Sequence, residues 1–291
     1  MRTGLGPTGQ GHQTALAMLV SDRLGLPLEA ITVSHGDTDL VPRGTGTYGS
    51  RSLQAGGVAV QGAAIKVVDK AKDLAADQLE ANPADIELDL ERGVFHVAGV
   101  PGRTVSWVQL ASALDEHGRL DELAMEEDFK PPAPTWPFGA HVAVVDVDTE
   151  TGKVALRRMV CVDDCGTILN PLLVDGQRHG GIAQGVAQAL MEEFSYDELG
   201  NPQTDNFVTY SPISAAELPA FELVSMETPT PINPLGAKGI GESTTIGSTS
   251  AAHNAVIDAL GPLGVRDVEM PATPQRVWLA VREARGRPAA D

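Results

Sequence analysis

Apolar side chains recur at helical spacing in several separate segments of the chain. Between residues 13 and 24 they recur every three or four positions, directly after a Gly-Gln-Gly turn. This spacing predicts an amphipathic helix, which Gly25 and Pro27 end. The same pattern predicts further helices over residues 54–79, 107–114, 172–193, 247–260 and 274–285.

Shorter runs of alternating or β-branched residues predict strands over 31–33, 86–90, 94–97, 142–147, 154–162 and 222–226. The second and third runs flank a Glu-Arg-Gly turn, and the fourth and fifth flank Thr-Glu-Thr-Gly, so each pair predicts a β-hairpin. Hairpins and helices occur in separate groups rather than in strict alternation. The sequence therefore predicts an α+β fold rather than a doubly wound parallel sheet.

A change in composition divides the chain. Residues 126–138 are acidic and then contain four prolines, a composition typical of a linker. We therefore expect a first lobe over 1–125 and a second lobe over 139–291, each mixing helices and strands.

Composition and charge exclude several classes of protein. With 42% hydrophobic and 21% charged residues among 291, the chain has the composition of a globular protein rather than a disordered one. Its formal net charge of −18 predicts that it repels the phosphates of nucleic acids. No apolar run approaches the roughly 20 residues of a membrane span, and the first residues have no signal-peptide core, so we expect a cytoplasmic protein. The two cysteines, Cys161 and Cys165, lack the spacing of a zinc or thioredoxin site.

Three glycine-rich loops, at 9–12, 44–52 and 236–242, are the strongest functional signals. Each presents backbone amides with little side chain in the way, and the first two precede helices, whose amino ends favour phosphate. Together they predict one large anionic cofactor, although each loop alone is more typical of a turn or a helix cap. A dinucleotide-binding fold is disfavoured, because Thr14 occupies the third glycine position and Asp37 opens a long loop.

Glu242 is the candidate acid–base residue. The neighbouring glycines let the main chain approach a bound group, and Lys238 offers a cation on the same loop. A carboxylate in a confined, partly apolar site has a raised pKa and can accept a proton near neutral pH. The alternative is that Glu242 caps a helix that starts near Gly247. The residues alone leave both hypotheses open.

Six motifs, taken in this order, resemble those of a known family. They span 9–14, 46–52, 136–141, 163–171, 176–181 and 238–242. In them the chain resembles the molybdenum-binding large subunit of the molybdenum hydroxylases, the family of xanthine dehydrogenase, aldehyde oxidase and aerobic carbon monoxide dehydrogenase. It is most similar to the last of these branches. The resemblance covers nearly the whole chain and implies the molybdenum-cofactor-binding fold of that family.

The resemblance also implies a molybdenum-pterin cofactor in its cytosine dinucleotide form, with the metal held through the pterin and not by side chains. In the first lobe this cofactor would be bound by Gln10, Gly11, His12, Thr14, Thr47, Tyr48, Gly49, Ser50, Arg51 and Ser52. In the second lobe it would be bound by Cys165, Thr167, Asn170, Gln177, Lys238 and Gly239. Glu242 matches the general base of the family. Two alternatives stay open: Arg51 pairs with a surface carboxylate, and His12 only begins its helix.

The family's large subunit is much longer than this chain, which implies that the chain is its carboxy-terminal, cofactor-binding part. We expect it to oxidise a small substrate, namely carbon monoxide, an aldehyde or an N-heterocycle, with water-derived oxygen. Its expected partners are the amino-terminal half of the large subunit and separate FAD-binding and 2Fe-2S subunits. The copper-carrying cysteine of the carbon monoxide branch lies in the missing half, and neither Cys161 nor Cys165 replaces it. The alternative is a truncated or split-gene remnant that folds without completing an active site.

Overall fold

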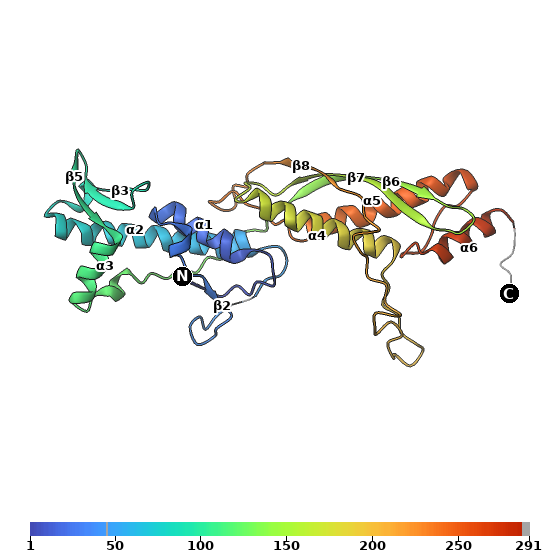
Figure 1. The fold of residues 1–291 in the computed structure, drawn as a ribbon, viewed down its shortest axis with the longest axis horizontal. Coiled ribbons are helices and arrows are strands. Elements are labelled where there is room, and N and C mark those ends of the chain that lie inside the picture. Colours follow the sequence, from blue (N-terminus) through green and yellow to red (C-terminus); the bar gives the residue numbers. More distant parts are fainter. Residues whose placement is uncertain (45, 287–291) are drawn as a thin grey trace. The chain divides into compact units, whose positions relative to one another are not determined.

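The computed structural model describes residues 1–44 and 46–286 (Figure 1). It divides into two compact units. Unit 1 comprises Met1–Pro134 and Pro231–Ala237, and unit 2 comprises Thr135–Thr230 and the described part of Lys238–Asp291. The chain thus leaves unit 1 within the proline-rich segment and returns to it once, a return for which the sequence pattern gives no signal.

Unit 1 packs its helices against a small antiparallel sheet. Its elements are β1 (Arg2–Thr3), α1 (His12–Leu24), η1 (Leu28–Ala30), β2 (Ser34–His35), η2 (Leu53–Gly57), α2 (Val58–Leu79), η3 (Pro83–Asp85), β3 (Ile86–Asp89), β4 (Val94–Val97), β5 (Val100–Ser106), α3 (Trp107–Glu116) and η4 (Leu120–Leu123). Strands β3, β4 and β5 form one antiparallel sheet in that order, and α1 packs against α2. Ala71, Phe95 and Leu110 are fully buried at the centre of the core.

Local chemistry sets the ends of the helices in unit 1. α1 ends where Gly25 adopts a left-handed conformation (φ 63°), and a side chain there would collide with the backbone of Leu90. α3 begins at a capping box, in which Ser106 and Gln109 each accept the other's backbone N–H. The helix predicted over 54–79 is confirmed as α2 from Val58 onward, and its first residues form the π-helical turn η2.

Two sequence-based expectations for unit 1 are corrected by the structure. The predicted strand 31–33 is coil, because Ile31 donates its N–H to Leu28 O and closes the turn η1. Pairing starts only at β2, which lies parallel to β1. The sequence pattern does not predict strand β5, because its Pro-Gly-Arg-Thr segment lacks apolar alternation. The hydrogen bonds that close η1 and pair β1 with β2 determine the backbone conformation between residues 28 and 35, and the hydrophobic pattern does not reveal them.

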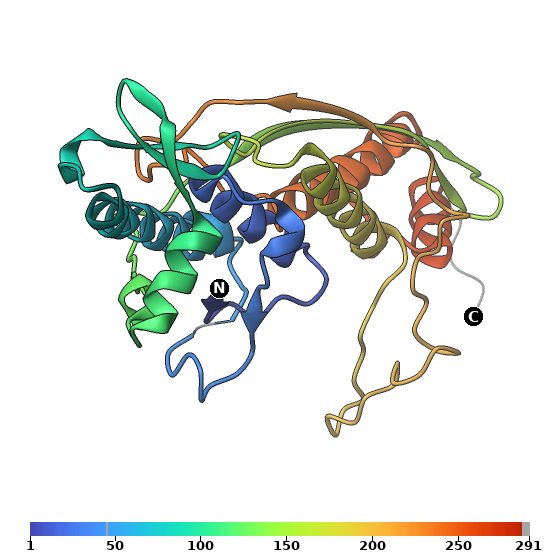
Figure 2. The same ribbon diagram turned by 60° about the vertical axis from the view of Figure 1, so that its left-hand side comes forward.

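Unit 2 is a three-stranded sheet with two long helices on one face (Figures 1 and 2). Its elements are β6 (Phe138–Val147), β7 (Val154–Asp164), α4 (Pro171–Leu190), β8 (Glu222–Met226), α5 (Ser243–Leu260), η5 (Gly261–Leu263) and α6 (Pro274–Ala284). β6 and β7 pair antiparallel, which confirms the predicted hairpin, and β8 adds parallel to β7. α4 and α5 pack side by side, and α5 also packs on β6.

The helices α4 and α5 approach closely because their facing residues are small. Gly181 and Gly185 of α4 lie directly against Thr244 and Ser248 of α5. A Cβ on either glycine would overlap the facing hydroxyl, so larger residues would push the helices apart. The fully buried core beside this contact contains Met159, Ile182, Val256, Val277 and Val281.

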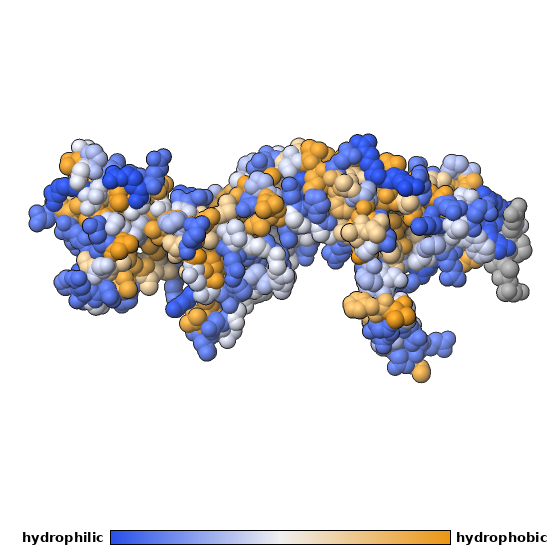
Figure 3. Space-filling view, viewed as in Figure 1, coloured by the Kyte–Doolittle hydropathy of each residue, from blue (hydrophilic) through white to orange (hydrophobic). Residues whose placement is uncertain are grey.

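An extended arm, residues 191–221, joins α4 to β8 and projects from the helices of unit 2 (Figures 1 and 2). Figure 3 shows hydrophobic as well as hydrophilic surface along it, and Leu199, Phe207 and Val208 are 88%, 87% and 93% exposed. Among the helices of the described residues, none combines the length and the apolar character needed to cross a membrane.

Candidate functional site

The first predicted motif forms the turn into α1. Gly11 occupies the N-cap position with a left-handed backbone (φ 77°) and has no side chain with which to cap the helix. Helical geometry gives the first amides of α1 no partner within the helix, so they are available to a ligand. Gln10 supports the turn, because its Oε1 accepts a hydrogen bond from the N–H of Thr8 at 2.6 Å. The turn therefore has the geometry of an anion-binding helix end.

His12, the first residue of α1, carries an unsatisfied buried atom. Its Nδ1 is buried and has no hydrogen-bond partner among the described residues. Burial lowers the pKa of His12, and the neighbouring His35 lowers it further, so the imidazole is neutral at pH 7. A buried nitrogen without a partner costs free energy, which a ligand that supplies a hydrogen bond would recover. Thr14, on the same turn, is exposed.

The second motif is an open loop between β2 and α2. Gly46 (φ 68°), Gly49 (φ 61°) and Ser50 (φ 52°) have left-handed backbones. No described atom lies within 4 Å of the place where a Cβ would stand on either glycine, so both border open space. The conformation of Ser50 is strained for a residue with a side chain, and such positions cluster at binding sites. The predicted loop also includes Thr45, which lies outside the described residues.

The side chains of this loop supply a cation, an aromatic ring and hydroxyls. The guanidinium of Arg51 stacks on the ring of Tyr48, 4.2 Å from its centroid. Tyr48 itself is 56% exposed. Ser52 donates from Oγ to Thr47 Oγ1 at 3.3 Å, which ties the end of the loop to its start.

The two motifs of unit 1 start next to each other. Gly4, ahead of the first motif, packs on the backbone of Arg43 and Gly44, ahead of the second. Gly6 lies beside Gly46, since a Cβ on Gly6 would stand 3.6 Å from Gly46 Cα. The structure thus places the residues just ahead of the first motif beside the start of the second, although the two are far apart in the sequence.

In unit 2, the loop at Lys238 is tied to the end of β7. The N–H of Lys238 donates to Cys165 O at 2.7 Å. Its ammonium donates to Asp164 Oδ1 at 2.9 Å and to Thr228 Oγ1 at 2.8 Å, and the paired side chains of Lys238 and Asp164 are 9% and 0% exposed. The N–H of Gly166 also donates to Asp164 Oδ1. Two predicted cofactor-binding residues, Lys238 and Cys165, are therefore neighbours.

Asp164 is ionised in this setting. Burial by itself raises the pKa of its carboxyl, but hydrogen bonds from the Gly166 N–H, Lys238 and Thr228 outweigh burial and hold the pKa below its ordinary value. The charge of Lys238 is consequently balanced inside unit 2. Sequence reasoning missed Asp164 as the partner of Lys238, although two consecutive acids at the end of an apolar strand are a visible signal.

The start of α4 carries further predicted residues. Asn170 is the N-cap of the helix, and its Oδ1 accepts a hydrogen bond from the N–H of Leu173 at 3.1 Å. Thr167 precedes the helix and Gln177 lies in its second turn, and both are half-buried. A Cβ on the adjacent Gly176 would meet no described atom within 4 Å. This part of α4 therefore has room for a ligand beside its backbone.

Glu242 occupies the N-cap position of α5. The helix begins at Ser243, so the start predicted near Gly247 is wrong. The Glu242 carboxylate makes no capping hydrogen bond to the described residues of α5, which argues against the helix-cap alternative. Glu242 is exposed, whereas Gly239 in the same loop is buried.

Asp163, also on β7, joins a second buried network that the sequence analysis did not assign. His141 Nε2 donates to Asp163 Oδ1 at 2.8 Å, and Arg178 Nε donates to Oδ2 at 3.1 Å. Arg178 is 1% exposed and also donates to the backbone oxygens of Cys161 and Val224. These bonds link β6, β7, β8 and α4 through one buried guanidinium.

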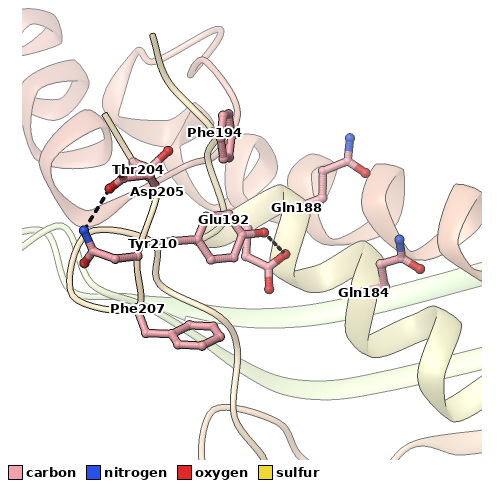
Figure 4. A pocket seen from close by; sticks show the side chains of 9 residues that line it. Gln184, Gln188, Glu192, Phe194, Thr204, Asp205, Phe207 and Tyr210 are labelled. Carbon is pink, nitrogen blue, oxygen red and sulfur yellow. Dashed lines mark hydrogen bonds between the residues drawn. The ribbon is translucent and has the colours of Figure 1, made fainter. Parts of the chain in front are cut away.

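A pocket that the sequence analysis did not predict lies between α4 and the arm (Figure 4). Its volume is about 500 Å³, and it is lined by Gln184, Gln188, Glu192, Phe194, Thr204, Asp205, Asn206, Phe207 and Tyr210. The hydroxyl of Tyr210 donates to Glu192 Oε2 at 2.8 Å, and this bond raises the pKa of Tyr210. The predicted cofactor-binding residues lie elsewhere.

The molybdopterin cofactor-binding domain family matches residues 1–219. The chain belongs to this family. It is 38% identical to the carbon monoxide dehydrogenase large chain of Hydrogenophaga pseudoflava, over 97% of this chain and 35% of that protein. It is also 38% identical to the nicotine 6-hydroxylase large subunit of Paenarthrobacter nicotinovorans, over 96% of this chain and 35% of that protein. A solved structure of carbon monoxide dehydrogenase from Oligotropha carboxidovorans superimposes with a TM-score of 0.86 at 36% identity, covering 98% of this chain and 35% of that one.

These matches confirm the family and the α+β fold that the motifs predict. This molybdopterin-binding domain spans about a third of the length of its relatives. Its predicted site residues belong to two sets: those between Gln10 and Ser52 lie in unit 1, and those from Cys165 onward lie in unit 2. Their convergence on one cofactor stays a prediction.

The residues of unit 1 in this molybdopterin-binding domain suit an elongated anionic ligand. The amino end of α1 has only Gly11 as its cap, and the buried His12 Nδ1 lacks a partner among the described residues. Open space beside Gly46 and Gly49 admits a large group, and Arg51 adds a positive charge. Amides, hydroxyls and a guanidinium suit phosphate and pterin oxygens better than they suit a bare metal ion.

The two thiols of the molybdopterin-binding domain are poor metal ligands. Burial, and then the charge of Asp163, raise the pKa of Cys161 to about 12. Burial, and then the charge of Asp164, raise the pKa of Cys165 to about 11. Such thiols stay protonated at pH 7, and metals bind thiolates. Within residues 1–44 and 46–286, no group of three or more His, Cys, Asp or Glu side chains could hold a metal ion.

Proposed function

We propose that this chain is the molybdenum-cofactor-holding part of a molybdenum hydroxylase, which oxidises a small substrate with water-derived oxygen. The observation that carries the proposal is the match of residues 1–219 to the molybdopterin cofactor-binding domain family. The cofactor, in its cytosine dinucleotide form, supplies the two-electron redox chemistry when bound. The chain supplies binding groups and one acid–base residue.

The binding groups form one set in each unit. In unit 1, the amides of α1 behind Gly11 and the loop 46–52 offer donors to an anionic ligand, and His12 Nδ1 offers a buried ring nitrogen that has no partner among the described residues. In unit 2, Cys165 O and Lys238 N–H fix the backbone of two predicted binding segments against each other. Because the ammonium of Lys238 is paired with Asp164, we propose that Lys238 acts by shaping its loop rather than by offering a free charge.

We propose Glu242 as the general base, with its carboxylate accepting a proton as the substrate is oxidised. It lies at the amino end of α5, directly after the loop of Lys238 and Gly239, two of the predicted cofactor-binding residues. It is exposed on unit 2, so bound cofactor and the remainder of the large subunit would have to enclose it. General-base catalysis in an enclosed site is worth about 10²–10⁴-fold in rate.

The substrate and the partners follow from the relatives. Identity of 38% to both a carbon monoxide dehydrogenase and a nicotine 6-hydroxylase does not favour one substrate, so carbon monoxide, an aldehyde and an N-heterocycle all remain in the proposed class. Because the chain spans about a third of these relatives, we propose that it works with the amino-terminal half of the large subunit. FAD-binding and 2Fe-2S subunits would carry the electrons onward, in the cytoplasm.

The test uses the complex purified with its natural partner chains. We expect one molybdenum per copy of this chain, measured by metal analysis, and dye reduction with at least one of carbon monoxide, benzaldehyde and quinoline. A complex that contains the partner chains but no molybdenum would overturn the proposed function.

The role of Glu242 is tested by Glu242→Gln in the same complex. Glutamine keeps the shape of the side chain but cannot accept the proton, so kcat should fall at least about 10²-fold while molybdenum content stays unchanged. Glu150→Gln, at an exposed glutamate in the turn between β6 and β7, is the matched control and should leave kcat unchanged. Turnover near that of the wild type at full molybdenum occupancy would remove Glu242 from the mechanism.

A further inference from the structure

The amino end of α5 rests on a buried imidazole. His141 lies on β6, and its side chain is 2% exposed. A Cβ on Gly247, in the second turn of α5, would stand 2.7 Å from His141 Nδ1 and 2.8 Å from its Cε1. The imidazole therefore lies directly against the main chain of α5, and only glycine at position 247 permits this approach.

The imidazole is held rigidly from its other side. Its Nε2 donates to Asp163 Oδ1 at 2.8 Å, and Asp163 Oδ2 accepts from Arg178 Nε at 3.1 Å. Arg178 is anchored in turn by two backbone oxygens of the sheet. His141 Nδ1, which faces Gly247, is buried without a hydrogen-bond partner among the described residues. The contact between His141 and α5 is therefore a van der Waals contact without a hydrogen bond, and it fixes how closely α5 approaches the sheet.

The same turns of α5 are fixed from a second direction by α4. Thr244 and Ser248 lie against Gly181 and Gly185, and the buried Thr244 hydroxyl has no hydrogen-bond partner in the described part of the chain. Close packing on α4 therefore sets the lateral position of α5, and the imidazole on β6 sets its distance from the sheet. Both contacts occur in the first two turns, the part of α5 nearest Glu242.

We propose that His141 is a positioning residue, which sets the location of the Glu242 carboxylate through its contact with Gly247. This inference rests on the proposed role of Glu242 as the general base. Glu242 precedes Gly247 by less than two helical turns, so a displacement of the helix backbone at Gly247 should move Glu242 by a similar distance. An added methyl group needs about 0.7 Å more room to reach an ordinary van der Waals distance from Nδ1. A misplacement of about 1 Å in a catalytic group can cost 10²-fold in rate.

The test is Gly247→Ala in the purified complex, probed with whichever of carbon monoxide, benzaldehyde and quinoline the wild type oxidises. We expect kcat to fall about 10- to 100-fold, with KM and molybdenum content unchanged. Amide hydrogen exchange over residues 243–248 should accelerate, although alanine normally stabilises a helix interior relative to glycine. Gly102→Ala, which adds a methyl group where no described atom lies within 4 Å, is the chemically matched control.

A second substitution at His141 distinguishes a displaced Glu242 from a general loss of structure in Gly247→Ala. Glutamine at position 141 can still donate to Asp163 but lacks the ring, so the double variant His141→Gln/Gly247→Ala should regain at least tenfold in kcat over Gly247→Ala. If Gly247→Ala fails to fold, His141→Gln alone is used, because loss of the ring should also accelerate exchange over 243–248 and lower kcat at unchanged molybdenum content.

The hydrogen-exchange measurement needs no catalytic activity, so it distinguishes this inference from the proposed function. If the rate of amide exchange over residues 243–248 is unchanged in Gly247→Ala, the inference that His141 fixes the position of α5 is overturned. Accelerated exchange with kcat equal to that of Gly102→Ala overturns the positioning role while Glu242 keeps its place as the base.

Discussion

Arg178 is expected to contribute more to the stability of unit 2 than any exposed cation of the sheet. Its side chain is 1% exposed and pairs with Asp163, which is 3% exposed, at 3.1 Å. It also donates to the backbone oxygens of Cys161 at 2.8 Å and Val224 at 2.9 Å, and to Ser225 Oγ at 3.0 Å. Arg178→Met keeps much of the side-chain volume and removes all of these donors.

The magnitude follows from what the substitution leaves behind. Asp163 keeps the hydrogen bond from His141 but loses the guanidinium of Arg178, and the buried carbonyl oxygen of Cys161 and the part-buried one of Val224 each lose a donor. Breaking a buried ion pair by removing one partner costs about 3–5 kcal/mol. For a folding unit of this size, each kcal/mol shifts Tm by about 2–4 °C. We therefore expect Tm to fall by roughly 6–20 °C.

The matched control is Arg158→Met on the same strand, β7. Arg158 pairs with Glu222 at 2.5 Å, but the two side chains are 59% and 49% exposed, so solvent screens the pair and it should contribute little to stability. Urea unfolding followed by circular dichroism gives both free energies on the whole chain. Equal losses in the two variants, or a loss below about 1 kcal/mol for Arg178→Met, would refute the assignment of Arg178 as a buried anchor.

Two further predictions concern titratable groups of unit 2. Since hydrogen bonds hold the pKa of Asp164 below its ordinary value, its contribution to stability should be complete above that ordinary value and be lost as the pH falls through the lowered one. In Lys238→Met the pKa of Asp164 should be lowered less, so the loss should be smaller and complete at a higher pH, and parallel curves of Tm against pH for the two proteins would contradict this. Because the pKa of Cys161 is about 12 and that of Cys165 about 11, a thiol reagent at pH 8 should react with both only after unfolding. Rapid reaction of either thiol in the native chain would count against their burial.

The elements that the sequence predicts well are those with a clear local period. α1, α2 and the hairpin of β6 and β7 combine a regular apolar pattern with a defined stop, such as Gly25 after α1. The failures lie where distant partners decide the conformation. Strand β2 pairs with β1, near the start of the chain, and residues 231–237 belong to unit 1 although their neighbours in sequence belong to unit 2. Neither feature produces a periodic pattern of apolar residues.

The candidate site divides in the same way. Glycine-rich segments can be found from the sequence because their backbones require glycine, as the left-handed conformations of Gly11 and Gly49 illustrate. The residues that hold those segments in place cannot be found so directly, because their partners come from other elements. Lys238 looks like a free cation in the sequence, and only the fold reveals Asp164 beside it.

Asp163 and Asp164 nevertheless carry a signal that the sequence contains. Two acids at the end of a buried apolar strand are costly unless each finds its own partner, so their presence implies two separate networks. The structure shows both: Asp164 binds Lys238, at the start of the segment 238–242, and Asp163 binds His141, which contacts α5 just after that segment. One end of β7 therefore fixes both ends of the segment that carries Glu242. The carboxylate proposed as the general base lies just ahead of α5 and needs this kind of support from rigid elements, and the acid pair supplies it from consecutive positions of a single strand.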